Sequence, residues 1–263
     1  MRICLTGSRG FLGSYVLKRL QKDGHIVTEF DKKIDKSQNL LTNDFKFLSN
    51  IDCVIHMAAE VGLKSCYEDP VLAVENNVLG TTRLLEACKT HRVKRFISTS
   101  TWAVKGNLEN PYDLTKLAAE NMARSYHKLH GLPVIVLRLG TAYGIGMSDA
   151  GVIPSYIRAI KANKPLVVQG RGIQLRQFTN AKDIAEAFNA AVTKGKIGET
   201  YYIVAPEVVS IKQLAETFDS EIKYKEARPG DEDYEILCSC RAKADLGWEA
   251  KVTLKEGIEE MKK

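Results

Sequence analysis

A glycine-rich turn directly after a short apolar run constrains the fold of this chain most. Residues 3–5 are apolar, and the run breaks into Thr6-Gly7-Ser8-Arg9-Gly10-Phe11-Leu12-Gly13. Apolar residues at helical spacing follow the turn, and a second apolar run, over residues 25–30, ends at Asp31. This is the spacing of a strand, a turn, a helix and a second strand, the unit that binds a dinucleotide.

The glycines and the acid each have a physical reason in such a unit. Gly7 permits the tight turn, Gly10 lets backbone N–H groups approach a pyrophosphate, and Gly13 lets the helix lie close to the sheet. The Asp31 carboxylate can accept hydrogen bonds from both hydroxyls of an adenosine ribose and would repel a 2′-phosphate. The sequence therefore favours NAD over NADP. Lys32 and Lys33 keep NADP open as an alternative, because either ammonium could contact a 2′-phosphate.

Length and composition set the class of protein. The chain has 263 residues, 44% of them apolar, which suits one large α/β domain or a nucleotide-binding domain with a smaller lobe. Neither a membrane span nor a signal peptide is recognisable, so a cytoplasmic location is expected. The net charge of +6 is not concentrated in one tract, so it does not indicate nucleic-acid binding. The six cysteines show no Cys-x-x-Cys spacing, which predicts neither a zinc site nor a disulfide framework; Cys4 and Cys53 are expected in buried strands.

Strand-like and helix-like segments alternate along the chain. Strands are predicted at 3–5, 25–30, 53–56, 93–98 and 134–139, and helices at about 71–90, 113–130 and 153–162. Such alternation predicts an α/β fold with a doubly wound parallel (Rossmann) sheet. Residues 1–143 and 179–205 are expected to form the NAD-binding domain. Residues 144–178 and 206–263 are expected to form a smaller C-terminal substrate lobe.

A second motif, Tyr112-Asp-Leu-Thr-Lys116, stands at the start of the helix after the fourth strand. Residues four apart share a helix face, so the ammonium can favour the phenolate of the tyrosine. A tyrosine working as a base near neutrality needs its pKa lowered by roughly three units, about 4 kcal/mol. The fourth strand ends at Thr101, and ligands bind at the carboxyl ends of parallel strands. Thr101 and Tyr112 together are expected to hydrogen-bond a substrate hydroxyl or carbonyl.

With these motifs in place, the chain resembles an extended short-chain dehydrogenase/reductase of the nucleotide-sugar epimerase/dehydratase family, of the UDP-glucose/UDP-galactose 4-epimerase kind. The resemblance covers nearly the whole length. Further segments that carry it are Asp52-Cys-Val-Ile-His56-Met-Ala58-Ala59, Asp69-Pro70, Asn77-Val-Leu-Gly80-Thr81, Leu137-Arg138-Leu139, Gly151-Val-Ile-Pro154, Arg176-Gln-Phe178 with Asp183, Arg228-Pro-Gly230-Asp231 and Lys243-Ala-Asp245-Leu-Gly247-Trp248.

The resemblance implies a role for each site residue. Tyr112 would be the acid/base, Thr101 would polarise the reacting oxygen, and Lys116 would also hold the nicotinamide ribose. Arg176 and Arg228 would clamp the diphosphate of the sugar nucleotide, a suitable task for two charged forks. The implied substrate-binding set is Thr101, Thr141, Val152, Arg176 and Arg228. The implied cofactor-binding set is Gly7, Arg9, Gly10, Phe11, Leu12, Gly13, Asp31, Lys32, Leu40, Leu41, Met57, Ala58, Ala59, Asn77, Ser98, Thr99, Tyr112 and Lys116. The two long helices would form a homodimer interface.

The residues after Thr101 discriminate between reactions. The 4,6-dehydratases that the chain resembles carry an Asp-Glu pair there, whereas this chain has Trp102 and Ala103, neither of which transfers a proton. A 4-epimerase needs no further acid, so C4 epimerisation of a UDP-sugar is the first hypothesis. A reductase or dehydrogenase of nucleotide sugars and a non-catalytic NAD-binding protein are the alternatives. The intact set of Thr101, Tyr112 and Lys116 argues against the last.

Overall fold

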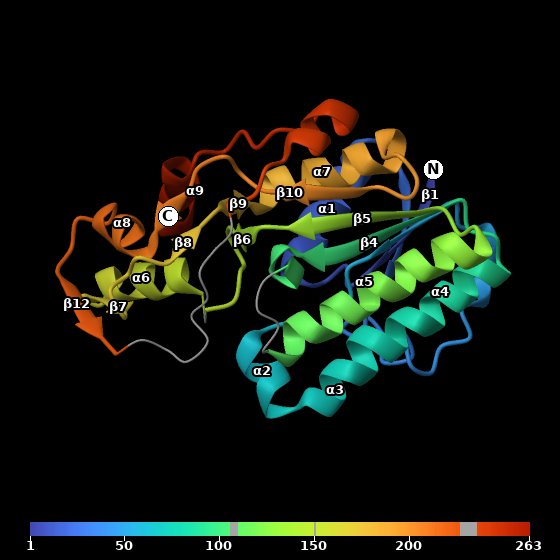
Figure 1. The fold of residues 1–263 in the computed structure, drawn as a ribbon, viewed down its shortest axis with the longest axis horizontal. Coiled ribbons are helices and arrows are strands. Elements are labelled where there is room, and N and C mark those ends of the chain that lie inside the picture. The colour runs from blue at the N-terminus through green and yellow to red at the C-terminus, as the bar shows by residue number, and fades with distance from the viewer. Residues whose placement is uncertain (106–109, 150, 227–235) are drawn as a thin grey trace.

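A parallel sheet of six strands forms the centre of the molecule (Figure 1). The structure is a computed structural model that describes residues 1–105, 110–149, 151–226 and 236–263. The strand order is β10-β5-β4-β3-β1-β2, and every neighbouring pair is parallel. The strands are β1 (Arg2–Thr6), β2 (Ile26–Phe30), β3 (Cys53–His56), β4 (Arg95–Thr101), β5 (Val134–Leu139) and β10 (Thr200–Ile203). The predicted doubly wound parallel sheet is confirmed.

Helices cover both faces of this sheet (Figure 1). Helices α1 (Phe11–Lys22) and α7 (Ala181–Lys194) pack on one face, and α4 (Gly80–Thr90) and α5 (Pro111–His130) pack on the other. Successive strand residues point to opposite faces, so Ile3 and Leu5 join the first core cluster while Cys4 joins the second. Burial on both faces explains why β1, β3 and β5 are largely apolar runs.

The chain reverses its direction of winding around β1. Strand β2 pairs with one edge of β1 and β3 with the other, so the turn after Thr6 and the segment after His56 leave the sheet side by side. Ligands of open α/β sheets bind in the crevice at such a switch point. Short elements connect the sheet around it: η1 (Lys46–Asn50), α2 (Leu63–Glu68) and η3 (Trp102–Lys105).

The helix predicted at 71–90 is interrupted by a π-helical turn. It consists of α3 (Pro70–Val74), the π-helix η2 (Glu75–Leu79) and α4. The neighbouring residues Asn76 and Asn77 are both buried. Asn77 bonds the backbone N–H and C=O of Glu60 and the hydroxyl of Thr115, while Asn76 accepts from the Lys32 ammonium. A π-turn accommodates one residue more than an α-turn, which lets two adjacent side chains face inward.

A third core cluster lies beyond the sheet. It joins α6 (Val152–Lys161), α8 (Ile211–Glu216) and α9 (Leu254–Lys262) around Tyr143 and Tyr156. Three pairs of short strands run through this region: β6 (Thr141–Tyr143) with β9 (Phe178–Asn180), β7 (Leu166–Gln169) with β12 (Ile222–Lys225), and β8 (Leu175–Arg176) with β11 (Val209–Ser210). The division of the chain into a cofactor domain and a substrate lobe stays a prediction. The π-helix η4 (Ala242–Leu246) packs with the first cluster, on α7.

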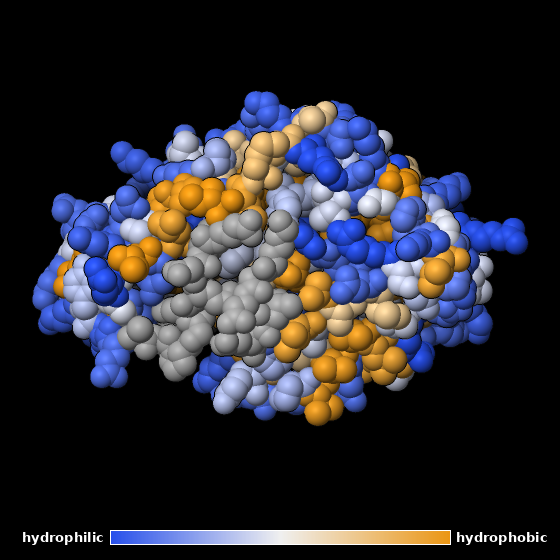
Figure 2. Space-filling view, in the orientation of Figure 1, coloured by the Kyte–Doolittle hydropathy of each residue, from blue (hydrophilic) through white to orange (hydrophobic). Residues whose placement is uncertain are grey.

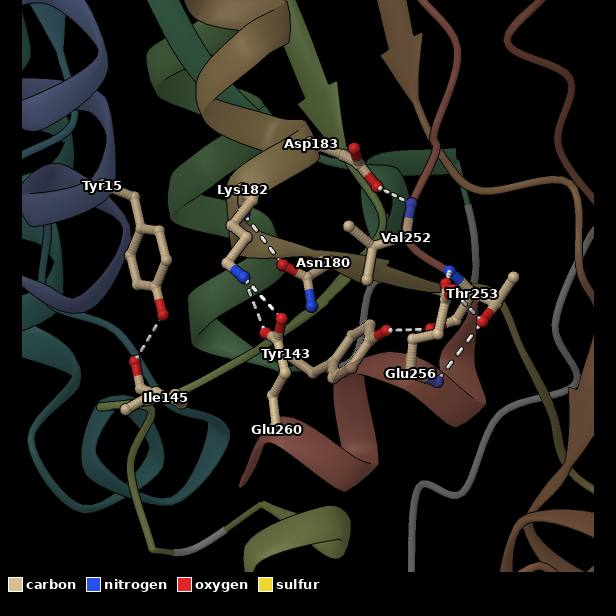
Figure 3. Close-up of polar contacts among 10 residues, drawn as sticks. All are labelled: Tyr15, Tyr143, Ile145, Asn180, Lys182, Asp183, Val252, Thr253, Glu256 and Glu260. Carbon is tan, nitrogen blue, oxygen red and sulfur yellow. Dashed lines mark hydrogen bonds and ion pairs between the residues drawn. The ribbon is translucent and has the colours of Figure 1, made fainter. Parts of the chain in front are cut away.

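Polar contacts hold the C-terminal segment on the start of α7 (Figure 3). The buried Asp183 carboxylate accepts from the backbone N–H groups of Lys251 and Val252, at 3.0 and 2.9 Å. Lys182 pairs with Glu260 of α9 at 2.7 Å. The Tyr143 hydroxyl donates to the carbonyl of Thr253. Because these contacts come from α7, α9 and β6, they tie the third cluster to the sheet.

The cysteines follow the prediction in part. Cys4 and Cys53 are buried in β1 and β3, as expected. No disulfide framework was expected, and one local disulfide is present, between Cys238 and Cys240. Their spacing of two residues is not the Cys-x-x-Cys pattern on which the prediction depended. No helix within the described ranges combines the length and the apolar character needed to cross a membrane.

Candidate active site

The glycine turn after β1 forms a cradle that only glycines fit. Gly7 adopts φ +72°, and a Cβ there would lie 2.8 Å from the backbone nitrogen of Ala58. A Cβ on Gly13 would lie 2.0 Å from the carbonyl oxygen of Gly7, so α1 approaches β1 through this glycine. No side chain caps the N-terminus of α1 and its first turn carries no acid. The free N–H groups and the helix dipole there suit a pyrophosphate.

Asp31 lies at the end of β2 beside this cradle. Its two carboxylate oxygens accept from the backbone N–H groups of Arg9 and Lys33, each at 2.9 Å. The Arg9 guanidinium is held by Glu29 of β2, through contacts of 2.8 and 2.9 Å. The Lys32 ammonium donates to Asn76 at 3.0 Å. Arg9 and Lys32 therefore have protein partners at the end of the site where an adenosine ribose would bind.

A buried histidine supports the cavity wall beside the glycine turn. The Thr6 hydroxyl oxygen accepts from the backbone N–H groups of Met57 and Ala58, so its proton is available for Nδ1 of His56, at 2.8 Å. The Nε2 of His56 lies 2.9 Å from the hydroxyl of Thr81, which itself donates to a backbone carbonyl. Burial, with a smaller contribution from the Lys116 ammonium, lowers the pKa of His56 to about 3. His56 is therefore a neutral structural link.

Tyr112, Lys116 and Thr101 line one cavity of about 670 Å³ together with the glycine turn and Asp31. Tyr112 stands in the first turn of α5, where Asn110 caps the helix by accepting from the Tyr112 N–H at 2.8 Å. Lys116 follows one helical turn later, and Thr101 ends β4. The site thus places a phenol, an ammonium and an aliphatic hydroxyl on a cleft shaped for a dinucleotide.

Burial dominates the electrostatics of the pair on α5. It raises the pKa of the Tyr112 phenol, and the Asp113 carboxylate raises it further. Burial lowers the pKa of Lys116 to about 8, against the opposing effect of the Glu120 carboxylate. The Lys116 ammonium, which the sequence led us to expect would favour the phenolate, does not outweigh this burial in the protein alone. A base at this position needs a further positive charge beside the phenol.

The structure brings most of the predicted site residues to the cavity wall. Those that line it are Gly7, Gly10, Phe11, Leu12, Gly13, Asp31, Lys32, Leu40, Met57, Ala58, Ala59, Thr99, Thr101, Tyr112 and Lys116. Those that do not are Arg9, Leu41, Asn77, Ser98, Thr141, Val152 and Arg176. Arg228 lies outside the described residues. Asn77 lies behind the wall, where it holds Glu60 and Thr115, and Arg176 lies in β8, paired with Val209.

Ten further residues line the cavity that the predicted set did not contain. They are Phe30, Lys33, Gln38, Glu60, Val61, Asn76, Ser100, Leu139, Gly140 and Ala142. Several of these follow the carboxyl ends of β2, β3 and β5. Their position after strand ends was the available signal, since all parallel strands of a sheet end at the same edge. The burial of Asn76 by the π-turn had no signal of this kind.

The fold and the cleft define a dinucleotide-binding α/β protein of the short-chain dehydrogenase/reductase type. Residues 3–204 match the model of the NAD dependent epimerase/dehydratase family. This chain belongs to that family. The sequence prediction of NAD agrees with the cofactor that the family uses.

Known proteins of several activities are similar to this chain. A trifunctional UDP-glucose 4,6-dehydratase/UDP-4-keto-6-deoxy-D-glucose 3,5-epimerase/UDP-4-keto-L-rhamnose-reductase of Arabidopsis thaliana is 28% identical over 97% of the chain, which spans 46% of that enzyme. A putative UDP-glucose 4-epimerase of Methanocaldococcus jannaschii is 27% identical, with 97% of this chain and 95% of the relative covered. The solved UDP-glucuronic acid 4-epimerase of Bacillus cereus, with UDP-glucuronic acid and NAD, is 27% identical with a TM-score of 0.90, covering 100% and 98% of the two chains.

Proposed function

We propose that this chain catalyses the NAD-dependent epimerisation at C4 of a nucleoside-diphosphate sugar of the UDP-glucose/UDP-galactose type. The observation that carries the proposal is the position of Thr101, Tyr112 and Lys116 on one cavity with the glycine cradle and Asp31. An acid/base and a hydroxyl beside a dinucleotide cleft suit the removal of a proton from a sugar hydroxyl. Similarity to 4-epimerases over the full chain supports the same reaction.

The glycine cradle is proposed to hold the pyrophosphate of NAD, with Asp31 on the adenosine ribose and Lys116 on the nicotinamide ribose. When bound, NAD supplies a hydride acceptor for C4 of the sugar and then a hydride donor to the opposite face. Tyr112 takes the proton of the 4-hydroxyl as C4 becomes a ketone, and returns it when the ketone is reduced. The Thr101 hydroxyl donates to the 4-oxygen throughout. The pKa of Tyr112, which burial raises, would be lowered again by the positive charge of a bound oxidised cofactor.

The residues after Thr101 favour epimerisation over dehydration. Trp102 and Ala103 follow it in η3, and neither side chain can exchange a proton with C5 or C6 of a sugar. A nucleotide-sugar reductase or dehydrogenase remains the alternative, and the reductase named in the plant relative supports it. An epimerase regenerates its cofactor in each turnover, whereas a reductase or dehydrogenase consumes it.

Thr141, Val152, Arg176 and Arg228 are proposed to bind the sugar nucleotide, the two arginines at its diphosphate. Arg176 stands beside Gln177, whose buried amide bonds both the N–H and the C=O of Leu237. This contact holds Leu237 next to β8. The guanidinium groups are suited to bidentate contacts with phosphate oxygens.

A homodimer is proposed through the face formed by α3, η2 and the start of α5. Val71, Val74, Leu79 and Leu114 are all exposed there, between 47% and 67%. Figure 2 shows apolar surface gathered over this side of the molecule. A second copy would bury these side chains. We expect light scattering to give the mass of a dimer and Leu79→Glu to give that of a monomer; a monomeric wild-type protein would contradict this.

The function is tested by incubating the protein with UDP-glucose, UDP-galactose and their N-acetyl and uronic forms, with catalytic NAD. We expect interconversion of one pair without net NADH. Tyr112→Phe should lower the rate by about 10²- to 10⁴-fold and leave NAD binding intact. Tyr126→Phe is the matched control, because Tyr126 lies on the same helix but bonds Glu86 away from the cavity.

Each other outcome has a definite meaning. Accumulation of NADH would replace the epimerase by the dehydrogenase alternative. NAD binding without conversion of any sugar would support a non-catalytic protein. Full activity in Tyr112→Phe would remove Tyr112 from the mechanism.

A further inference from the structure

Glu120 lies at the centre of a buried polar network under the proposed active site. It is 1% exposed. Its carboxylate accepts from the Ser100 hydroxyl at 2.7 Å, from Arg138 Nε and Nη2 at 3.0 and 2.7 Å, and from Arg124 Nε at 3.0 Å. Four donors, three of them from guanidinium groups, satisfy a carboxylate that burial alone would penalise.

This network joins the helix of the proposed acid/base to the two strands beneath it. Glu120 follows Lys116 by four residues and Tyr112 by eight, so all three lie along one side of α5. Ser100 lies on the cavity wall next to Thr101 in β4, and Arg138 precedes the cavity residue Leu139 in β5. A single carboxylate thus fixes α5 against both strands that end at the site.

We infer that Glu120 is a positioning residue that sets the register of α5 over β4, and with it the placement of Lys116 and Tyr112 relative to Thr101. The inference rests on the proposed function for the roles of those three residues. The contact of α5 with β4 is a feature of the fold and is independent of the proposed function. Neither Ser100 nor Glu120 belongs to the site sets drawn from the sequence.

The charge of Glu120 reaches the site as well as its hydrogen bonds. The bonds from Arg138 and Ser100 hold the pKa of the Glu120 carboxyl below its usual value against the opposing effect of burial, so it is an anion at neutral pH. That anion supports the protonated form of Lys116, whose pKa burial lowers to about 8. Two titratable groups near Lys116 are uncharged at neutral pH. Burial lowers the pKa of His56 of β3 to about 3, and burial and the Asp113 carboxylate raise the pKa of Tyr112.

Two variants distinguish a positioning role of Glu120 from a role in stability alone. Glu120→Gln keeps the shape and removes the negative charge. Arg124→Ala removes one partner of the same carboxylate from the outer side, where the Arg124 side chain is 41% exposed, and keeps the charge. Lys116 is titrated directly, without substrate, from the pH dependence of its acylation measured by peptide mass spectrometry.

We expect the wild-type midpoint near pH 8. In Glu120→Gln the midpoint should fall by about one pH unit, because the anion that favours the ammonium is gone. In Arg124→Ala it should stay within about 0.3 units. An unchanged midpoint in Glu120→Gln, or an equal shift in both variants, would overturn the inference, because a purely structural pair lowers stability without moving Lys116 selectively.

Ser100→Ala keeps the inference testable if Glu120→Gln does not fold. This variant removes the hydrogen bond from Ser100 of β4 to Glu120 of α5. The Glu120 carboxylate stays ionised, because its arginine partners remain. We expect the dissociation constant of NAD, from calorimetry, to rise about fivefold with the Lys116 midpoint unchanged. NAD affinity within twofold of wild type would overturn the positioning role. If the wild-type protein converts no sugar, but the Lys116 midpoint shifts in Glu120→Gln and the NAD dissociation constant rises in Ser100→Ala, the proposed function fails and the inference stands.

Discussion

Replacing Glu29 by glutamine should relax the preference of this chain for NAD over NADP. Glu29 holds the Arg9 guanidinium by two contacts, at 2.8 and 2.9 Å, while the backbone of Arg9 donates to Asp31. Arg9 therefore lies where the proposed adenosine ribose meets Asp31, yet its charge is directed to Glu29. A guanidinium released there is a natural partner for a 2′-phosphate.

The magnitude follows from the exposure of the pair. The Arg9 side chain is 51% exposed and that of Glu29 is 22% exposed, so the ion pair itself contributes about 0.2–1 kcal/mol. A hydrogen bond from the guanidinium to a phosphate contributes about 1.5–3 kcal/mol. In the wild type a 2′-phosphate must displace Glu29 to reach Arg9, so removing Glu29 should raise NADP affinity by the energy of the ion pair, about 1 kcal/mol at most, or up to about fivefold. NAD carries a neutral hydroxyl at that position, so its affinity should change little.

The assay is the ratio of the dissociation constants of NADP and NAD, measured by calorimetry at one salt concentration. Glu186→Gln is the matched control, because Glu186 of α7 pairs with Arg19 of α1 at 2.7 Å and neither residue lines the cavity. We expect the ratio to fall about two- to fivefold in Glu29→Gln and to stay constant in the control. An unchanged ratio in Glu29→Gln would refute the reasoning, since Arg9 would then not reach a 2′-phosphate.

Three further predictions concern the cradle, the last helix and the buried histidine. Gly13→Ala should abolish measurable NAD binding in calorimetry and lower stability by about 1–3 kcal/mol, because its Cβ would meet the Gly7 carbonyl at 2.0 Å; retained binding would contradict the cradle. Gly257→Ala should lower the free energy of unfolding in urea by about 1–2 kcal/mol, although alanine favours helices, because its Cβ would lie 2.3 Å from the Tyr143 hydroxyl; a stabilised variant would contradict this packing. Since the folded-state pKa of His56 is about 3, against an ordinary histidine value of 6.5, the unfolded chain binds a proton between these values that the folded chain does not. Stability should therefore fall as pH drops through this window, and less steeply in His56→Asn; equal urea midpoint shifts between pH 7 and pH 5 in both proteins would show that His56 does not titrate this way.

The sheet was predictable because its inner strands β1, β3 and β5 are buried on both faces. Strands β3 and β5 begin and end at the predicted residues, and β1 extends the predicted run by one residue at each end. An apolar run of this kind needs no distant partner to be recognised. The glycine cradle was predictable for a similar reason. Gly7 and Gly13 are required by close backbone contacts within one strand-turn-helix unit and its neighbouring strand.

What the sequence did not predict depends on contacts between distant segments. Apolar spacing treats 71–90 as one helix, since the partners that draw Asn76 and Asn77 inward lie in other elements. The position of Arg176 follows from the pairing of β8 with β11. Strands of two residues are too short to be recognised from the sequence. The direction of the Tyr112 pKa is likewise set by burial in the folded protein rather than by the neighbouring lysine.

The π-turn at Glu75–Leu79 has a consequence for how this chain can vary in length. An α-helix rotates by about 100° per residue, so loss of one residue from the turn would swing the preceding segment by that angle. Asn76, which holds Lys32 near Asp31, and Asn77, which holds Thr115 beside Lys116, would no longer both face the protein. The extra residue of the π-turn therefore lets Asn76 and Asn77 stabilise the two ends of the cleft. A single deletion there would disturb both ends at once, so this stretch tolerates substitution at its exposed positions far better than any change in length.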